Sequence, residues 1–335
     1  MEWKDLERLP TAGGDTWQAR RIGGRLIRGQ LAVEAAVAKW HPLDPLMVSP
    51  PGSPRYLPVL HVEALRQRVH AALRRRHIAA IIALLVTAAI LVASGYFAGR
   101  ASALRAGAMA FALVAFLLLD YHVAVRRIDA LAERALFAIW VCRSGVRHAL
   151  AWAAALIVIG ALQRYAEGQY GGTEALLIEL GAVRELVGRE PWRVVIGPWL
   201  HGSAAHWLAN FAMLSFASLL VGPLLRAARA AALLIGGSTF GALVSLAIEA
   251  TSPSDVYLGI SAGIFALLGW CAGAAMRRPA SFPQGFAVSV AGFALLNIAI
   301  AALAAPTASN AGHAAGLGLG VLVGLAFPPS CRRAG

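Results

Sequence analysis

The chain has 335 residues and a formal net charge of +13, yet only 14% of its residues are charged and 59% are hydrophobic. Soluble domains usually contain about 25% charged residues, so this composition excludes a soluble protein with a charged surface, and it equally excludes a disordered chain. Three cysteines are too few for a disulfide scaffold. The charges lie in short blocks between long apolar runs, which argues against a nucleic-acid partner and indicates charges at membrane edges.

Residues 1–76 precede the apolar runs, and we expect them to form a cytoplasmic amino-terminal tail. Six prolines between Pro42 and Pro58 argue against a long helix there. In residues 61–76, apolar residues recur at helical spacing beside five arginines. This pattern predicts a basic amphipathic helix on the membrane surface that leads into the first span, with a solvated helix as the alternative. No positively charged start followed by an apolar core occurs, so we expect no cleaved signal peptide.

Eight membrane-spanning helices are predicted from the apolar runs. A span needs about 20 mainly apolar residues, and lipid cannot hydrogen-bond an exposed peptide group, so helices are the expected form. The shortest run extends backwards if Arg143 and Arg147 reach the interface. The fold class is therefore an all-α polytopic membrane helix bundle. Its predicted spans are residues 78–99, 106–125, 149–163, 204–225, 230–248, 256–276, 282–304 and 311–327, the last two being separated by a turn-type sequence at 305–310.

Connections rich in arginine alternate along the chain with connections that have few arginines or balance them with glutamates. The arginine-rich set consists of the amino-terminal tail and residues 126–147, 226–229, 277–278 and 332–333. The positive-inside rule therefore predicts that both termini are cytoplasmic, which agrees with an even number of spans. The composition is rich in alanine and arginine, with lysine only at Lys4 and Lys39. We expect a multi-pass protein of the bacterial cytoplasmic membrane.

Polar and ionisable side chains inside a span are costly, so they are functional candidates. Ser261 opens the sixth span, His313 opens the eighth, and His206 and Asn210 lie at the start of the fourth. All three spans run from outside to inside, so these groups should lie at a similar depth below the outer surface. A serine in a span often bonds a carbonyl of its own helix. Beside a histidine base, however, it is suited to nucleophilic acyl transfer.

Further residues around these groups have supporting roles in this hypothesis. His206 and Asn210 are four apart on one helix face, so both can point at the oxyanion of a tetrahedral intermediate. His201 falls on another face or in the preceding loop, where we expect it to support the site.

Glycines flank both reacting groups. Gly259 and Gly263 lie on either side of Ser261, and Gly316 follows His313 on its helix. Small residues at intervals of four let two membrane helices approach closely. A hydrogen bond between Ser261 and His313 would require such an approach.

Three segments of the chain resemble the rhomboid intramembrane serine proteases. They are residues 190–210, which end in the His-Trp-Leu-Ala-Asn run, residues 259–269 with Gly-Ile-Ser-Ala-Gly, and residues 312–320 with Gly-His-Ala-Ala-Gly. The likeness covers about residues 149–328. It implies a six-helix rhomboid core at 148–328, preceded by two additional transmembrane helices and a cytoplasmic connection at 77–147. Residues 329–335 would be a cytoplasmic tail.

The resemblance implies a role for each matching position. Ser261 is similar to the family's nucleophile and His313 to its general base, in a dyad without an acidic third member. His206 and Asn210 match the positions that stabilise the oxyanion, together with the Ser261 backbone amide. The resemblance implies no cofactor and no metal.

Four more positions bear on the resemblance. Trp192 and Arg193 match a structural Trp-Arg pair in the long first loop of the family. Ala262 stands where glycine often follows the serine, which raises the question of crowding at the oxyanion site. Phe265 stands where a tyrosine often stacks on the histidine, and a phenyl ring can still stack there.

The expected reaction is hydrolysis of a peptide bond in or beside the transmembrane helix of a single-pass membrane protein, on the outer side of the bilayer. One alternative is a catalytically silent relative that binds transmembrane helices, although such a protein would not need both Ser261 and His313. A transporter is a further alternative. It would place polar groups along a path through the bilayer, whereas these groups cluster near one face.

Overall fold

The computed structural model describes residues 9–10, 15–21, 24–249, 255–304 and 309–329. The chain divides into two compact units, the first comprising Met1–Arg143 with Ala280–Ser289 and the second Ser144–Pro279 with Val290–Gly335. Of the carboxyl-terminal tail predicted at 329–335, only Pro329 is described. The turn predicted at 305–310 also lies largely outside the described residues.

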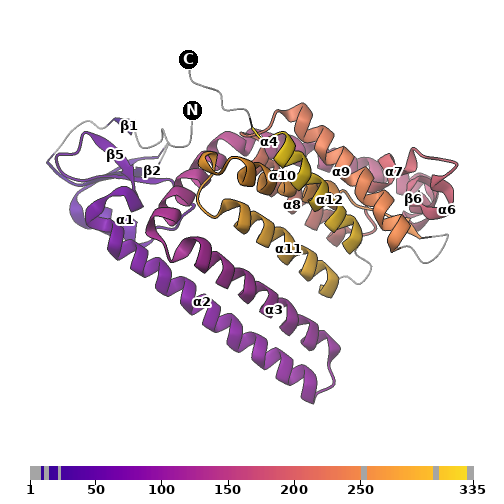
Figure 1. The fold of residues 1–335 in the computed structure, drawn as a ribbon, viewed down its shortest axis with the longest axis horizontal. Coiled ribbons are helices and arrows are strands. Elements are labelled where there is room, and N and C mark those ends of the chain that lie inside the picture. Colours follow the sequence, from indigo (N-terminus) through magenta and orange to yellow (C-terminus); the bar gives the residue numbers. More distant parts are fainter. Residues whose placement is uncertain (1–8, 11–14, 22–23, 250–254, 305–308, 330–335) are drawn as a thin grey trace. The chain divides into compact units, whose positions relative to one another are not determined.

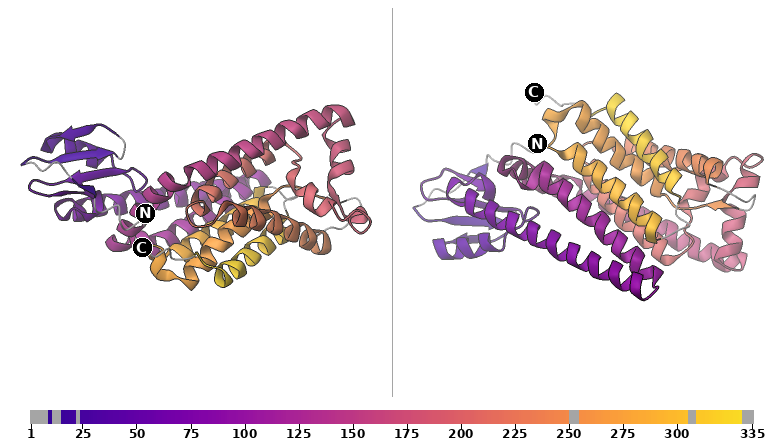
Figure 2. Two further views of the ribbon diagram at one scale, coloured as in Figure 1. Left: turned by 90° about the horizontal axis from the view of Figure 1, so that it is seen from above. Right: turned by 60° about the horizontal axis from the view of Figure 1, so that its bottom comes forward.

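The first unit begins with a small antiparallel sheet that the sequence analysis missed (Figure 2). Its strand order is β1-β5-β4-β2-β3, and helix α1 (Gln30–Ala38) follows β3. The strands are β1 (Leu9–Pro10), β2 (Gln18–Arg21), β3 (Leu26–Arg28), β4 (Leu46–Ser49) and β5 (Arg55–Pro58). The sequence predicted an amphipathic helix in residues 61–76 but not this sheet.

The sheet was not predicted from the sequence because its strands are short. None of the described strands in the sheet exceeds four residues, which is too short to establish a two-residue alternation. All four residues of β4 are buried, and Trp40 donates its indole N–H to the Asp44 carbonyl oxygen at 3.0 Å. Prolines exclude helix interiors, but they are tolerated in turns and at strand ends. The same prolines that argued against a helix are compatible with this sheet.

Two long helices complete most of the first unit. Helix α2 (Glu63–Phe97) is continuous, so the predicted amphipathic segment and the first span form one helix rather than two. Its first turns contribute Leu65 and Val69 to the hydrophobic core beneath the sheet. Helix α3 (Ala101–Asp120), extended by a π-helical turn (Tyr121–Val125), packs along α2 (Figure 1).

Helix α4 (Ile128–Tyr170) contains the third predicted span but is much longer than that span. Charged residues bound the apolar run of a span but do not end a helix, so the helix extends beyond the predicted span on both sides. Within the first unit, Arg134 binds the Asp120 carboxylate and donates to the Ser289 hydroxyl at 2.7 Å. This pairing explains how the second predicted span accommodates an acidic residue at its end.

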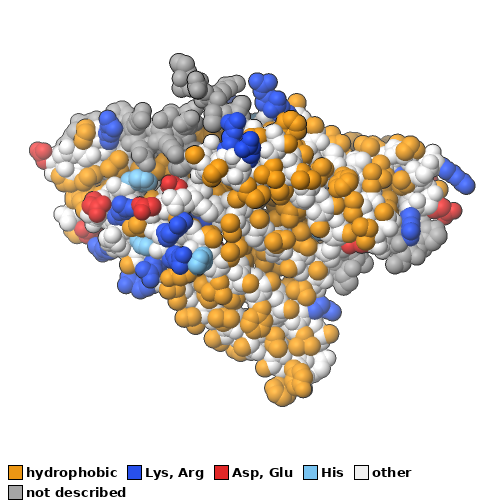
Figure 3. Space-filling view, viewed as in Figure 1, with side chains coloured by type: hydrophobic (Ala, Val, Ile, Leu, Met, Phe, Trp, Pro, Cys, Tyr) orange, Lys and Arg blue, Asp and Glu red, His pale blue; other side chains and the backbone are white. Residues whose placement is uncertain are grey.

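The remaining predicted spans correspond to five helices. They are α8 (Ala204–Val221), α9 (Ala227–Ile248), α10 (Ser261–Arg277), α11 (Phe286–Ala304) and α12 (Asn310–Ala326). By length and composition, six described helices can cross a membrane, namely α2, α3 with its π-helical turn, α4, α8, α9 and α11, while α10 and α12 are shorter apolar helices. The predicted all-α polytopic membrane bundle is confirmed. Hydrophobic side chains cover much of the helical surface in Figure 3, as expected for helices that face lipid.

The second unit is built around α10. Every residue from Ala262 to Ala275 is buried, and both α9 and α12 pack along this helix (Figure 1). The long loop after α4 is ordered into short helices α5 (Thr173–Leu180), α6 (Arg184–Val187) and α7 (Arg193–Ile196). Its strand β6 (Ala182–Val183) pairs antiparallel with β7 (Val256–Tyr257), just before α10. The loop is thereby attached to the segment that leads into Ser261.

Candidate active site

Ser261 is the first residue of α10, and a glycine turn sets its position. Gly259 has φ = +91°, a left-handed conformation that favours glycine, and its N–H donates to the Leu200 carbonyl oxygen at 2.9 Å. A Cβ at this position would lie 2.5 Å from His206 Nε2 and 3.4 Å from Asn210 Nδ2. A glycine at position 259 therefore permits the turn and leaves room for the side chains of α8. It does not bring α10 and α12 together.

Ser261 and His313 form a hydrogen bond. Ser261 Oγ lies 2.8 Å from His313 Nε2, although the two residues are 52 positions apart in the chain. His313 lies in the first turn of α12, where Ser309 Oγ accepts the Gly312 N–H at 3.0 Å as an amino-terminal cap. The ring is buried, and its Nδ1 has no hydrogen-bond partner among the described residues. For Nε2 to accept the serine proton, Nδ1 must carry the other ring proton.

Glycines bring α10 and α12 into backbone contact. A Cβ at Gly316 would lie 2.1 Å from the Ala262 carbonyl oxygen, and one at Gly320 would lie 2.1 Å from that of Ala266. Gly269 on α10 approaches the Leu317 carbonyl oxygen in the same way, at 2.2 Å. No side chain larger than hydrogen fits at these positions without moving a helix. This contact allows a short serine side chain to reach a histidine on another helix.

Gly263 packs against a different helix from the one expected. A Cβ at Gly263 would lie 2.1 Å from the Leu234 carbonyl oxygen, so this glycine lets α9 rather than α12 approach α10.

The side chains of Ala262 and Phe265 also have definite neighbours. The Ala262 methyl group points at Gly241 of α9, and the Phe265 ring lies 4.7 Å from the His313 ring between centroids, at an interplanar angle of 42°. The Ala262 methyl group is thus accommodated beside Gly241, and the Phe265 ring keeps an aromatic contact with the His313 ring.

His206 and Asn210 lie on the face of α8 that meets the Gly259 turn. Asn210 is buried, and its amide nitrogen donates to the His206 carbonyl oxygen at 3.2 Å. An amide nitrogen has two protons, so one donor remains for another acceptor. Ser261 is at the amino terminus of α10, where backbone N–H groups have no intrahelical acceptor. The His206 ring and the Asn210 amide therefore lie beside the Gly259 turn, two residues before Ser261.

His201 lies in the loop before α8, as one of the two expected alternatives had it. Gln163 of α4 binds both backbone polar groups of His201, donating to its carbonyl oxygen at 2.7 Å and accepting its N–H at 3.0 Å. The His201 ring contacts the His206 ring edge to face, with centroids 5.1 Å apart. Burial, and secondarily repulsion by His206, lower the pKa of His201 to about 4. His201 is therefore neutral near pH 7 and positions His206 by packing.

Arg193 braces the long loop before α8. Its guanidinium donates to the Glu190 carboxylate at 2.6 Å and to the carbonyl oxygens of Ile178 and Gly181 at 3.0 Å each. It also lies over the Trp192 ring, 4.8 Å from the centroid. Arg193 is buried while Trp192 is partly exposed. Neither side chain contacts Ser261 or His313 in the contacts described, so both act on the loop.

The sequence analysis missed Glu249, which ends α9. Its carboxylate accepts hydrogen bonds from the Ala311 N–H at 2.7 Å, the Ser309 hydroxyl at 2.7 Å and the Ser245 hydroxyl at 3.0 Å. Burial by itself would raise the pKa of the Glu249 carboxyl, but these hydrogen bonds and one from the Asn310 backbone lower it below its ordinary value. A carboxylate at the amino terminus of α12 is also favoured by the helix dipole. Glu249 therefore holds the first turn of the helix that carries His313.

Tyr257 of β7 was missed as well. Its side chain is buried and lies beside Ser261, the Ala262 backbone and Gly312. A solitary tyrosine before a span has no sequence signal, since only the pairing of β6 with β7 brings it here.

No group of three or more His, Cys, Asp or Glu side chains with metal-site geometry occurs among the described residues.

Residues 188–330 match the family model of the rhomboid domain. This part of the chain is a rhomboid domain. The match includes Ser261, His313, His206 and Asn210, while α4 precedes it and contacts it through Gln163, which binds His201. No curated protein matches the chain. With this domain and its long apolar helices, the chain is a multi-pass membrane protein.

Proposed function

We propose that the protein is an intramembrane serine endopeptidase with Ser261 as nucleophile and His313 as general base. The observation that carries this proposal is the 2.8 Å hydrogen bond between Ser261 Oγ and His313 Nε2. A serine hydroxyl becomes an effective nucleophile when an adjacent base takes its proton. Here the base is on a different helix, and the two helices are held at backbone distance by glycines.

The reaction then proceeds in two halves. Ser261 Oγ attacks the carbonyl carbon of the scissile peptide bond while its proton moves to His313 Nε2. The tetrahedral intermediate collapses when His313 returns that proton to the leaving amine, which produces an acyl-enzyme. Water, deprotonated by the same His313 nitrogen, hydrolyses the ester and restores the serine. Apart from water and the substrate, each step uses side chains or backbone groups of this chain.

The oxyanion of each tetrahedral intermediate needs preorganised donors. The Ser261 backbone N–H is one, because its place at the start of α10 leaves it without an intrahelical acceptor. The second amide proton of Asn210 and the His206 ring are the others, since both approach the turn that precedes Ser261. Backbone and side-chain donors of this kind each contribute about 10²- to 10³-fold to the rate.

The substrates in this proposal are single-pass membrane proteins, cleaved in or next to their transmembrane helices. The distribution of arginine supports cytoplasmic termini, an active site on the outer side and residence in a bacterial cytoplasmic membrane. A catalytically silent rhomboid-like protein that binds transmembrane helices is the second candidate. The intact Ser261–His313 hydrogen bond favours the protease over this alternative.

The test is labelling and cleavage by the reconstituted full chain. A fluorophosphonate should label the wild type, and a single-pass substrate should be cleaved. Ser261→Ala and His313→Ala should each abolish both, with cleavage lowered at least about 10³-fold. Matched controls are Ser215→Ala, which removes a hydroxyl bonded within α8, and His122→Ala in the first unit, neither of which should change either readout. Cleavage that survives Ser261→Ala contradicts the proposal, and substrate binding without cleavage by the wild type favours the silent relative.

A further inference from the structure

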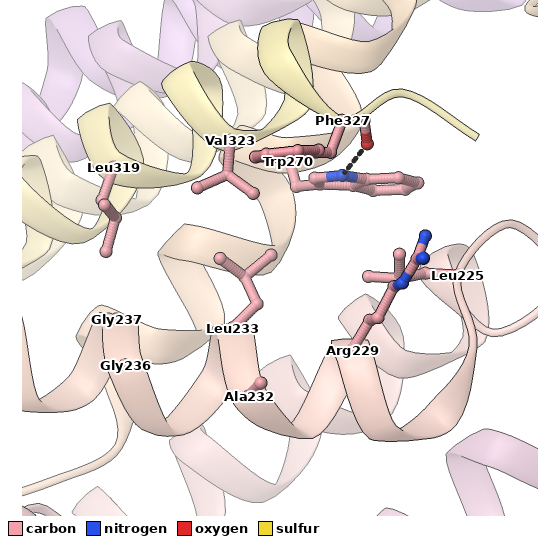
Figure 4. A pocket seen from close by; sticks show the side chains of 10 residues that line it. All are labelled: Leu225, Arg229, Ala232, Leu233, Gly236, Gly237, Trp270, Leu319, Val323 and Phe327. Carbon is pink, nitrogen blue, oxygen red and sulfur yellow. Dashed lines mark hydrogen bonds between the residues drawn. The ribbon is translucent and has the colours of Figure 1, made fainter. Parts of the chain in front are cut away.

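A second concave site lies in the second unit, away from the catalytic residues. It is a groove of about 450 Å³ between α9, α10 and α12 (Figure 4). Trp270, which lines it, is nine residues after Ser261 on α10, which corresponds to about 14 Å along the helix. This volume is within the range of small-molecule sites. The groove is therefore large enough for a ligand and separate from the proposed protease site.

The walls of the groove are almost entirely apolar. Leu233 of α9 and Val323 of α12 face each other across it, and the Trp270 ring covers one end (Figure 4). The indole N–H of Trp270 donates to the Phe327 carbonyl oxygen at 3.1 Å, so these polar groups are already satisfied. A ligand in this part of the groove must be hydrocarbon-like.

One end of the groove carries a cation. Arg229 lines it from the first turn of α9 and is exposed, and its guanidinium makes no ion pair or hydrogen bond within the described part of the chain. The sequence contains no Asp or Glu at residues 191–248 or 256–335, so the helices that line the groove supply no counter-charge. The amino terminus of a helix also favours an anion over a cation. This end is therefore complementary to a negatively charged group.

The other end of the groove has room for a bulky hydrocarbon chain. Gly236 lies about two turns beyond Arg229 on α9, it is exposed, and a Cβ placed on it would meet nothing within 4 Å. Its neighbour Gly237 instead packs against Ala266 of α10, where a Cβ would lie 2.5 Å from the alanine methyl group. Gly236 thus widens the groove, whereas Gly237 serves helix packing.

We propose that this groove binds one anionic glycerophospholipid. The lipid phosphate lies at Arg229, and an acyl chain lies along Leu233, Gly236 and Val323. A cationic group above an apolar groove between transmembrane helices matches the two parts of such a lipid. The bound lipid joins α9 to α12 and so stabilises the helices that hold the Ser261–His313 pair.

Native mass spectrometry of the full chain in a non-ionic detergent tests the proposal. Dioleoyl-phosphatidylglycerol and dioleoyl-phosphatidylcholine would be titrated separately. The wild type should bind one phosphatidylglycerol about fivefold more tightly than phosphatidylcholine, which is the effect of one arginine on an anionic headgroup. Arg229→Gln should remove this preference. Arg226→Gln, an exposed arginine that precedes α9 outside the groove, should retain it.

A second pair of variants tests the acyl-chain part of the site. Gly236→Leu should weaken binding of both lipids because the new side chain occupies the groove. Gly318→Leu is the matched control, since a Cβ at Gly318 also meets nothing within 4 Å but this glycine does not line the groove. Equal binding of both lipids by the wild type, or equal effects of the two arginine variants, would overturn the proposal. So would a dimer of the chain that Gly236→Leu dissociates, because the groove would then be a protein interface.

Discussion

Two helix pairs in this protein pack tightly, α2 with α3 and α10 with α12, but they pack in different ways. In the first pair, a Cβ at Gly107 would meet the Val92 side chain at 2.5 Å. In the second pair, a Cβ at Gly316 would meet a backbone carbonyl oxygen at 2.1 Å. Much of α2 is exposed, whereas α10 is buried continuously from Ala262 to Ala275. Gly107 therefore accommodates a neighbouring side chain, whereas Gly316 brings two helix backbones into contact.

This difference shows what close approach makes possible. A serine side chain extends only one atom beyond Cβ, so it reaches a histidine on another helix only where the backbones nearly touch. The α10–α12 pair meets that condition, and it positions Ser261 and His313 at hydrogen-bond distance. In the α2–α3 pair, His70 and His77 bond instead to backbone carbonyl oxygens of Val125 and Leu117. These histidines stabilise packing and are not paired with a nucleophile.

Among changes in helix packing, the largest expected effect comes from breaking the backbone contact. Gly316→Ala places a methyl group against the Ala262 carbonyl oxygen, so α12 must move and His313 must move with it. A displacement of about 1 Å at reacting groups can cost about 10²-fold in rate, and we expect at least that loss in a cleavage assay. Gly318→Ala on the same helix adds a methyl group in open space and should cleave normally. If both variants are equally active, the backbone contact is not needed for catalysis.

A smaller effect is expected from Glu249→Gln, which leaves the helices in contact but removes the charge that holds the first turn of α12. Loss of charge-assisted hydrogen bonds should lower the free energy of unfolding by about 1–2 kcal/mol and reduce cleavage less than Gly316→Ala does. Thermal unfolding in detergent measures the first effect. Glu185→Gln, an exposed glutamate in α6, is the control and should behave as the wild type.

The Glu249 effect should depend on pH in a definite direction. The pKa of this carboxyl is lower in the folded chain than its ordinary value of 4.5, so the ionised group stabilises the fold. That contribution is complete above the ordinary value and is lost as the pH falls through the folded pKa. The melting temperatures of the wild type and Glu249→Gln should therefore differ at pH 7 and converge in acid. A difference that persists at low pH would contradict this role.

The smallest effect on cleavage is expected in the α2–α3 pair. Gly107→Ala crowds the Val92 side chain, and overpacking of this kind costs about 1–3 kcal/mol. The melting temperature should fall, while the cleavage rate of the folded protein should not change, because this pair contributes no residue to the proposed site. A large loss of cleavage by correctly folded Gly107→Ala would show that the two pairs are coupled.

Much of the fold and of the candidate site was predictable from local patterns. The long apolar runs predicted the helices, since a span needs only enough hydrophobic residues in succession. Ser261, His313, His206 and Asn210 were identifiable because polar groups in such runs are rare. The amino-terminal sheet was not predictable, because strands of at most four residues carry too little periodicity. Glu249 was also missed, because its partners Ser309 and Ala311 are about 60 positions away in the sequence.

The sequence by itself determined which long apolar segments are helical and which of them carry polar groups. Each of these follows from composition over a few turns of chain. Only the tertiary structure decided which glycine meets which helix, so that Gly316 admits α10 whereas Gly263 admits α9. It also decided that Tyr257 and Glu249 lie beside the site. The physical reason is that spacing of four marks a face of a helix, whereas the partner of that face depends on how all the helices pack together.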